Sequence, residues 1–133
     1  MKIKNIILGI VLCFISITPL TSCKANSDIC GKYVLYNKEI PWHFIEYLNY
    51  DYNYIILHDN YKYETKNKIN NIVTHTDGKW VMSEDYTQFG FVMKLTFAAS
   101  YVEYYPYDYE NKTITIKTEI DSYDVTFTYK LEQ

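Results

Sequence analysis

The chain has 133 residues, 22% of them charged, and a formal net charge of −3 at neutral pH. All 13 of its cationic residues are lysines, so it lacks the guanidinium groups that recognise phosphates and base edges in two-pronged fashion. This composition argues against nucleic acid as a partner. The unusual feature is the content of 16 tyrosines, because aromatic side chains favour strands and interfaces.

A lipoprotein signal is predicted at the beginning of the chain. Two lysines, Lys2 and Lys4, precede an apolar stretch over residues 6–17, and the motif Leu-Thr-Ser-Cys follows at residues 20–23. The arrangement resembles the lipobox signal peptide of bacterial lipoproteins. The resemblance implies cleavage between Ser22 and Cys23, a diacylglycerol thioether on Cys23, and attachment to a membrane through the acylated Cys23.

Two other interpretations of residues 1–22 stay open. One is a transmembrane anchor, although the apolar stretch is shorter than the roughly 20 residues that a spanning helix needs. The other is an ordinary secretory signal, which would leave Cys23 as a plain thiol. Under the lipoprotein resemblance, Lys24 stands where an inner-membrane retention signal would have aspartate. The expected location is therefore the cell envelope, at the outer membrane if the host has one, facing either side of it.

Removal of residues 1–22 would leave 111 residues, and the loss of Lys2 and Lys4 would lower the net charge to −5. A chain of this length can form a core without disulfides. Residues 23–30 are expected to be a flexible lipidated tether, and residues 31–133 to form one domain. Cys30 would then be the only free thiol, either a half-buried small side chain or a partner in an intermolecular disulfide.

The first half of this domain alternates apolar and polar residues with the period of a strand. Strands are expected over residues 31–36, 54–58 and 61–66, with a turn at Asp59-Asn60. Residues 40–51 break the alternation, because Pro41 precedes apolar residues at helical spacing, and they predict a short helix.

The second half continues the same pattern. Residues 67–76 are expected to be a loop with a marginal strand, and Asp77-Gly78 a turn before a strand that starts at Lys79. The remaining strands and the turns between them are expected at residues 91–97, 101–105, 110–112 (turn), 113–119, 121–122 (turn) and 125–131. About eight antiparallel strands in so short a chain must hide their edges, so the predicted fold is an all-β, small antiparallel β-barrel with one short helix.

A resemblance to small lipocalin-like bacterial lipoproteins rests on three segments. They read Gly-Lys-Tyr-Val-Leu at residues 31–35, Tyr-Ile-Ile-Leu-His-Asp-Asn-Tyr-Lys-Tyr at 54–63, and Gly-Lys-Trp at 78–80. Their rhythm is similar to the family pattern G-x-W/Y, F-x-x-D-G-x-Y, G-x-W, with Tyr33 in the first aromatic position and Asn60 in place of the usual glycine. A barrel of eight strands can either fill its own interior or hold one small ligand.

No catalytic or metal-binding motif is recognisable. The three histidines, at positions 43, 58 and 75, lack the close spacing of zinc ligands, and the chain has no Gly-x-Ser-x-Gly and no glycine-rich phosphate loop. The sequence therefore predicts no cofactor, no metal and no enzyme. If the protein were a hydrolase, His58 with Asp59 would be the place to begin.

The candidate binding face is a tyrosine-rich segment around Pro106. On an extended chain alternate residues share a face, and here they are Tyr101, Glu103, Tyr105, Tyr107 and Tyr109. One barrel face cannot bury so many large side chains, so part of this segment is expected to be an exposed acidic aromatic patch that binds a protein or a sugar. The alternative is a curved strand whose tyrosines pack along the barrel wall.

These observations favour a lipid-anchored, non-catalytic binding lipoprotein of the cell envelope. Its partner would be a small apolar ligand inside the barrel or a protein bound through the tyrosine-rich face. The alternative is a periplasmic immunity or inhibitor lipoprotein that neutralises a protein toxin, since an acidic surface speeds encounter with a basic target.

Overall fold

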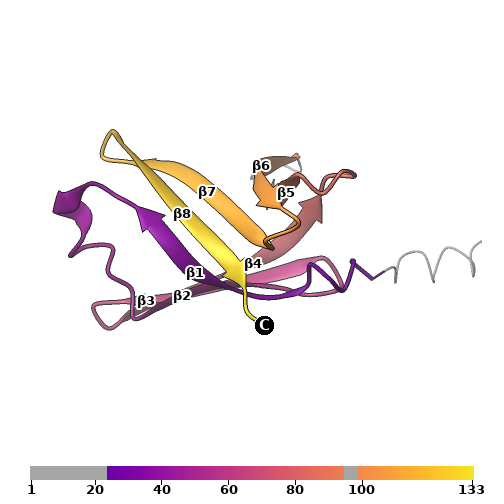
Figure 1. Cartoon of the computed structure of the whole chain (residues 1–133), viewed down its shortest axis with the longest axis horizontal. Coiled ribbons are helices and arrows are strands. Elements are labelled where there is room, and N and C mark those ends of the chain that lie inside the picture. Colours follow the sequence, from indigo (N-terminus) through magenta and orange to yellow (C-terminus); the bar gives the residue numbers. More distant parts are fainter. Residues whose placement is uncertain (1–23, 95–98) are drawn as a thin grey trace, which may run out of the picture.

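The protein folds as a closed eight-stranded antiparallel barrel in a computed structural model that describes residues 24–94 and 99–133 (Figure 1). Each strand pairs with the next along the chain, and β8 pairs back with β1. The strands are β1 Gly31–Glu39, β2 Tyr52–Leu57, β3 Lys62–Ile69, β4 Ile72–Met82, β5 Gln88–Lys94, β6 Ser100–Asp108, β7 Thr113–Ile120 and β8 Tyr123–Leu131. The predicted all-β barrel is confirmed. The predicted signal and the acylated Cys23 lie outside the described residues.

The expected helix is only a single 3-10 turn, η1, over Trp42–Phe44. Pro41 precedes it with φ −58°, as expected for a residue that starts a helical turn. The backbone N–H of Leu48 donates to the carbonyl of Phe44 at 2.9 Å, but the chain then continues without regular structure into β2. The apolar residues at helical spacing therefore anchor a loop rather than a helix.

Residues 67–76 are predicted to be a loop with a marginal strand, and the loop part of this prediction is wrong. These residues form the hairpin of β3 and β4, whose turn places Asn70 and Asn71 at φ 50° and 65°, the left-handed conformation that asparagine tolerates. Asp77 and Gly78 lie within β4 rather than in a turn. Gly78 is required for close packing, since a Cβ at this position would lie 2.7 Å from the ring of Tyr63.

The other predicted turns, at residues 59–60, 110–112 and 121–122, are confirmed in position, but their backbone conformations differ. Asp121 and Ser122 have φ 49° and 69°, the paired left-handed residues of a tight hairpin, so the turn between β7 and β8 is confirmed. In the turn between β2 and β3, the left-handed residue is Tyr61, at φ 62°, rather than Asp59 or Asn60. Asn60 contributes its side-chain oxygen, which accepts from the N–H of Lys62 at 3.1 Å.

Residues 24–30 are not the flexible tether that the sequence predicts. Ala25 and Ile29 are only 5% and 1% exposed and belong to the hydrophobic core. The N–H of Ala25 donates to the carbonyl of Asp59 at 2.7 Å, and the hydroxyl of Tyr33 donates to the carbonyl of Ile29 at 2.7 Å. This segment packs across one end of the barrel, which we call the closed end.

The opposite end, which we call the distal end, carries η1 and the turns of the β3–β4 and β7–β8 hairpins (Figure 1). Near the closed end the barrel is filled by large side chains, of which Trp80, Tyr33 and Phe89 are fully buried. Towards the distal end β4 is exposed on both faces from Ile72 to Asp77. A strand exposed on both faces has no apolar alternation to reveal it, which explains the failed prediction there.

The β5–β6 hairpin pairs with its two neighbouring strands, β4 and β7, over only part of its length. β4 pairs with β5 only from Lys79 to Met82, and β6 pairs with β7 only through Tyr107–Ile114 and Asp108–Thr113. Figure 1 shows β5 and β6 nearly end-on, whereas β1, β7 and β8 extend along the length of the molecule. The ring of strands is therefore continuous near the closed end and splits beyond it.

Candidate functional site

The predicted tyrosine-rich face lies on the inner side of the barrel wall. Tyr101, Glu103 and Tyr105 pair with Met93, Phe91 and Phe89 of β5, and Phe89 is fully buried in the core. Paired residues of antiparallel strands point to the same face. The expectation of a shared face is therefore correct for these residues, but that face looks inwards.

Tyr107 is a core residue rather than a binding residue. It is 5% exposed, its hydroxyl lies 3.0 Å from the hydroxyl of Tyr33, and the two rings meet edge to face. Burial raises the pKa of both phenols, and for Tyr33 the hydrogen bond with Tyr107 raises it further. The alternative interpretation, packing along the barrel wall, is correct at this position.

Tyr109 lies beyond the end of β6 and does not continue the face. Its hydroxyl donates to a carboxylate oxygen of Asp28 at 3.2 Å, and its ring contacts the ring of Tyr86. The ammonium group of Lys112 lies 3.2 Å from the centre of the Tyr109 ring. Tyr109 thus helps to hold residues 24–30 at the closed end.

Three members of the predicted face remain accessible, and we call them the acidic cluster: Tyr101, Glu103 and Tyr105. The hydroxyls of Tyr105 and Tyr101 donate to the two carboxylate oxygens of Glu103 at 3.0 and 3.5 Å. Burial, followed by the bond to Glu103, raises the pKa of Tyr105 to about 12. Among the described residues no lysine or histidine forms an ion pair with Glu103. Its charge is therefore held only by hydroxyl groups.

Beside this cluster, β6 and β7 have unpaired edges that face each other. Residues 100–106 of β6 have no pairing partner on β7, and residues 115–120 of β7 have none on β6. We call these two facing segments the β6–β7 seam. An open strand edge is a template for another strand.

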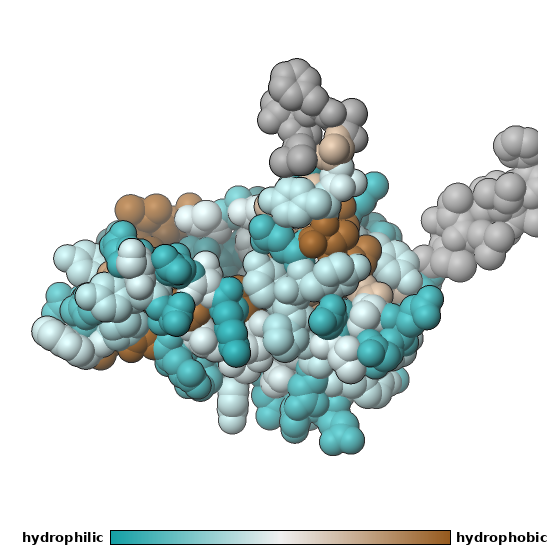
Figure 2. Space-filling model, turned by 90° about the horizontal axis from the view of Figure 1, so that it is seen from above, coloured by the Kyte–Doolittle hydropathy of each residue, from teal (hydrophilic) through white to brown (hydrophobic). Residues whose placement is uncertain are grey.

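A second accessible surface lies at the distal end. Large apolar side chains that are about half exposed or more gather on η1, the loop after it, and the turns of two hairpins. We call this group the distal rim: Trp42, Ile45, Tyr47, Ile72, Val73 and Tyr123. The ring of His43 lies 4.7 Å from that of Tyr123, which joins the η1 loop to the β7–β8 turn. Figure 2 shows brown, apolar surface towards the same end of the molecule.

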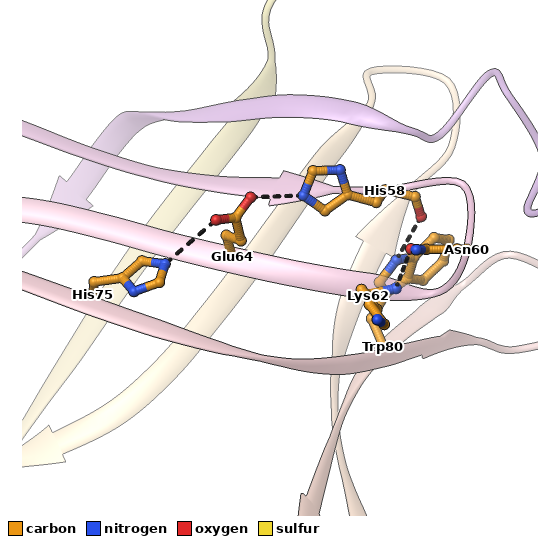
Figure 3. Close-up of polar contacts among 6 residues, drawn as sticks. All are labelled: His58, Asn60, Lys62, Glu64, His75 and Trp80. Atoms are coloured by element: carbon orange, nitrogen blue, oxygen red, sulfur yellow. Dashed lines mark hydrogen bonds and ion pairs between the residues drawn. The ribbon is translucent and has the colours of Figure 1, made fainter.

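The sequence did not reveal a polar cluster on the outer face of β2, β3 and β4 (Figure 3). The Nε2 atom of His58 lies 2.7 Å from one carboxylate oxygen of Glu64, and Nε2 of His75 lies 3.4 Å from the other. The hydrogen bond with His58 is the main cause that lowers the pKa of Glu64. The indole N–H of buried Trp80 donates to the carbonyl of His58 and fixes its position.

This cluster does not match the candidate catalytic pair His58–Asp59. Asp59 points away towards Lys24, at 3.9 Å, and the partner of His58 is Glu64. In the part of the chain that the structure describes, no three histidine, cysteine or acidic side chains are placed to hold one metal ion. The sequence could not predict the contact between His58 and Glu64, because this contact depends on the pairing register of β2 and β3.

An open pocket of about 740 Å³ lies next to this cluster, where β5 separates from β4. Lysines from three strands, Lys62, Lys79 and Lys94, line it together with Glu64 and Asp77. Both signs of charge and the open shape make it a solvated groove. It is not an enclosed apolar cavity of the kind that a small lipid would need.

Cys30 is half-buried, as one of the two predictions for it states. Burial raises the pKa of its thiol, and the nearby carboxylate of Asp59 raises it further. A thiol with a raised pKa is a poor nucleophile. The intermolecular disulfide stays a prediction.

The described residues include no helix of the length and apolar character needed to cross a membrane. No protein-family model, no curated protein and no solved structure matches this chain.

Proposed function

We propose that this protein is a lipid-anchored, non-catalytic binding protein of the cell envelope and that its partner is another protein. The observation that carries the proposal is the distal rim, where exposed Trp, Tyr, Ile and Val side chains gather at one end of the barrel. Clustered exposed apolar residues on a small domain are typical of interaction surfaces. A further accessible surface is the acidic cluster on β6, which is part of the predicted tyrosine-rich face.

The position of residues 24–30 supports this proposal. An acyl group on Cys23 would lie one residue before Lys24 and two before Ala25, whose N–H is bonded to the turn between β2 and β3. The closed end would therefore stay near the lipid surface. The distal rim lies at the opposite end (Figure 1), so it would be presented away from the membrane.

A small apolar ligand in the barrel interior has less support than a protein partner. The interior near the closed end is filled by Trp80, Tyr33 and Phe89, each fully buried, and Trp80 stacks on Phe89 with ring centres 6.1 Å apart. A small barrel that fills its own interior leaves no room for a ligand there. The filled closed end therefore favours binding at the surface.

A photo-crosslinking side chain in living cells tests the proposal. Placed at Tyr47 on the distal rim, it is expected to form one discrete adduct with a protein. A matched probe at Asn111, exposed near the closed end, should form none. The double variant Trp42→Ser, Ile72→Ser should remove the Tyr47 adduct while the protein stays at the membrane. Adducts of equal yield at both positions, or none at Tyr47, would contradict the proposal.

The anchor is tested separately. Labelled palmitate is expected to mark the wild-type protein, and Cys23→Ala should abolish both the label and the membrane fraction. If Cys23→Ala still partitions with membranes, the proposed anchor is wrong.

The second candidate is an immunity or inhibitor lipoprotein against a protein toxin. It is favoured by the charge of −5 that remains without residues 1–22, and by the carboxylate of Glu103, which forms no ion pair with any described residue. A basic toxin would complement both features. A strain that lacks the gene should then lose viability beside sibling cells, and wild-type protein should restore it, whereas Glu103→Gln should restore it poorly.

A further inference from the structure

The β6–β7 seam has a definite hydrogen-bonding polarity. The N–H of Tyr107 donates to the carbonyl of Thr87 at 2.8 Å, which continues the ladder between β6 and β5. Backbone groups of successive strand residues point to alternate sides. Glu103 and Tyr105 are odd-numbered like Tyr107, so their backbone groups point to β5. Val102 and Tyr104 are even-numbered, so their backbone groups point into the seam.

The opposite edge of the seam follows the same rule. The N–H of Leu131 donates to the carbonyl of Lys112 at 2.9 Å, so even-numbered residues of β7 direct their backbone groups to β8. The backbone groups of Thr115, Lys117 and Glu119 then face the seam. Within the described ranges neither edge has a pairing partner there.

Pro106 explains why the pairing of β6 and β7 stops where it does. Asp108 directs its backbone groups to β7, and Pro106, two residues earlier, would do the same. Pro106 would therefore be the next residue of β6 to donate a hydrogen bond to β7, but proline has no N–H. The ladder therefore ends after Tyr107–Ile114. Beyond Pro106, the free donors and acceptors of Val102 and Tyr104 form a short template for an added strand.

The side chains beside this edge indicate what kind of strand fits. Glu103 points to the inner face between Tyr101 and Tyr105, and the ring of Phe91 lies 5.9 Å from that of Tyr105. A strand added next to β6 would place one of its inward side chains beside the Glu103 carboxylate and its inward neighbours beside aromatic rings. The complementary segment has a basic side chain flanked, two residues away on each side, by apolar ones.

We propose that the seam binds an extended segment of a partner protein by strand addition to β6, with a lysine or arginine of that segment paired to Glu103. This inference rests on the proposed function, because it takes the partner to be a protein.

The test uses the acylated full-length protein, purified from its own membrane in mild detergent. A library of linear peptides is selected against it, and an enriched peptide is synthesised for affinity measurement and residue-level amide hydrogen exchange. We expect enriched peptides to carry a basic residue between apolar ones at alternate positions. The amides of Val102 and Tyr104 should gain protection on binding, whereas the amides of Glu103 and Tyr105 should change little because β5 already pairs with them.

Proline substitutions on the free edge give the matched comparison. Val102→Pro removes a donor that the barrel does not use, and Val102→Thr keeps it. Tyr104→Pro and Tyr104→Phe form a second pair if the first proline variant does not fold. Each proline variant should weaken peptide binding by about tenfold or more, as expected for a lost backbone hydrogen bond, and each control should bind like the wild type. Glu103→Gln should weaken only peptides that carry the basic residue.

Several outcomes would overturn the inference. They are an absence of enriched peptides, proline variants that bind the peptides as tightly as the wild type does, protection at the distal rim in place of the seam, or a dimer of this chain joined through β6. The proposed function fails separately, if the Tyr47 probe captures no protein in cells. A Tyr47 adduct that persists in Val102→Pro cells, with no peptide binding at the seam, would reject the strand addition and leave the proposed function standing.

Discussion

Among the described residues, His58 and Glu64 form the shortest contact between charged or titratable side chains on the outer wall, with Nε2 of His58 2.7 Å from the Glu64 carboxylate. The carboxylate joins two strands, because its other oxygen lies 3.4 Å from Nε2 of His75 on β4. A carboxylate between two imidazoles is favoured in its charged form. This contact has a consequence for stability at acid pH.

The first prediction concerns that consequence. The folded protein lowers the pKa of Glu64 from its ordinary value of 4.5, so the folded state keeps the charge to a lower pH than the unfolded state. The contribution of Glu64 to stability is therefore present above pH 4.5 and is lost as the pH falls through the lowered pKa. Glu64→Gln should melt slightly below the wild type at neutral pH, and the gap should close on acidification.

Thermal melts at a series of pH values measure this gap. Glu119→Gln, which neutralises an exposed carboxylate on β7, is the control and should leave the melting temperature nearly unchanged. A gap between Glu64→Gln and wild type that widens in acid would contradict the assignment.

The second prediction concerns the segment before β1. Because Ile29 is 1% exposed and packs in the core, Ile29→Ala should lower the free energy of unfolding by about 2–5 kcal/mol. Ser27→Ala, an exposed position in the same segment, should change it by less than about 0.5 kcal/mol. Denaturant unfolding followed by tryptophan fluorescence measures both. Equal stability of the two variants would mean that residues 24–30 are a tether after all.

The third prediction concerns the buried pair of hydroxyls. Tyr33→Phe removes the donor to the Ile29 carbonyl and the neighbour of the Tyr107 hydroxyl, and should cost about 1–3 kcal/mol of stability. Tyr107→Phe should cost less, because the Tyr33 hydroxyl keeps its bond to Ile29. A double-mutant cycle measured by denaturant unfolding should then show coupling between the two positions. Strictly additive losses would show that the 3.0 Å contact contributes nothing.

The fourth prediction concerns the close approach of Tyr63 to β4. Gly78→Ala would place a methyl group 2.7 Å from the Tyr63 ring and should destabilise the protein by about 1–3 kcal/mol. In the Tyr63→Leu background the same substitution should cost much less, since the ring is gone. Melting temperatures of the four proteins in this cycle give the answer. An equal loss of stability in both backgrounds would mean that Gly78→Ala acts through the backbone and not through the Tyr63 ring.

The β7–β8 hairpin shows how far the sequence alone could go. Ile114 and Ile116 alternate with threonines, and Val125, Phe127 and Tyr129 do the same on the next strand. Alternation with period two follows from one buried and one solvated face, so it is visible without any tertiary contact. Together with Asp121-Ser122 it predicts this hairpin, and its repetition along the chain predicts a closed barrel.

The candidate site depended on contacts that no local pattern records. The face shared by Tyr101, Glu103 and Tyr105 follows from strand periodicity, but whether that face looks inwards depends on its pairing with β5. The cluster of His58, Glu64 and His75 exists only through the registers of three strands.

The sequence by itself determined the number of strands, most of their positions and the closure of the sheet. A strand with one buried face alternates apolar and polar residues, and this alternation is visible in the sequence. Only the tertiary structure decided that residues 24–30 join the core, that Tyr107 is buried against Tyr33, and that β6 pairs with β7 only near the closed end. These features arise from contacts between segments far apart in the chain. Such contacts leave no period in either segment.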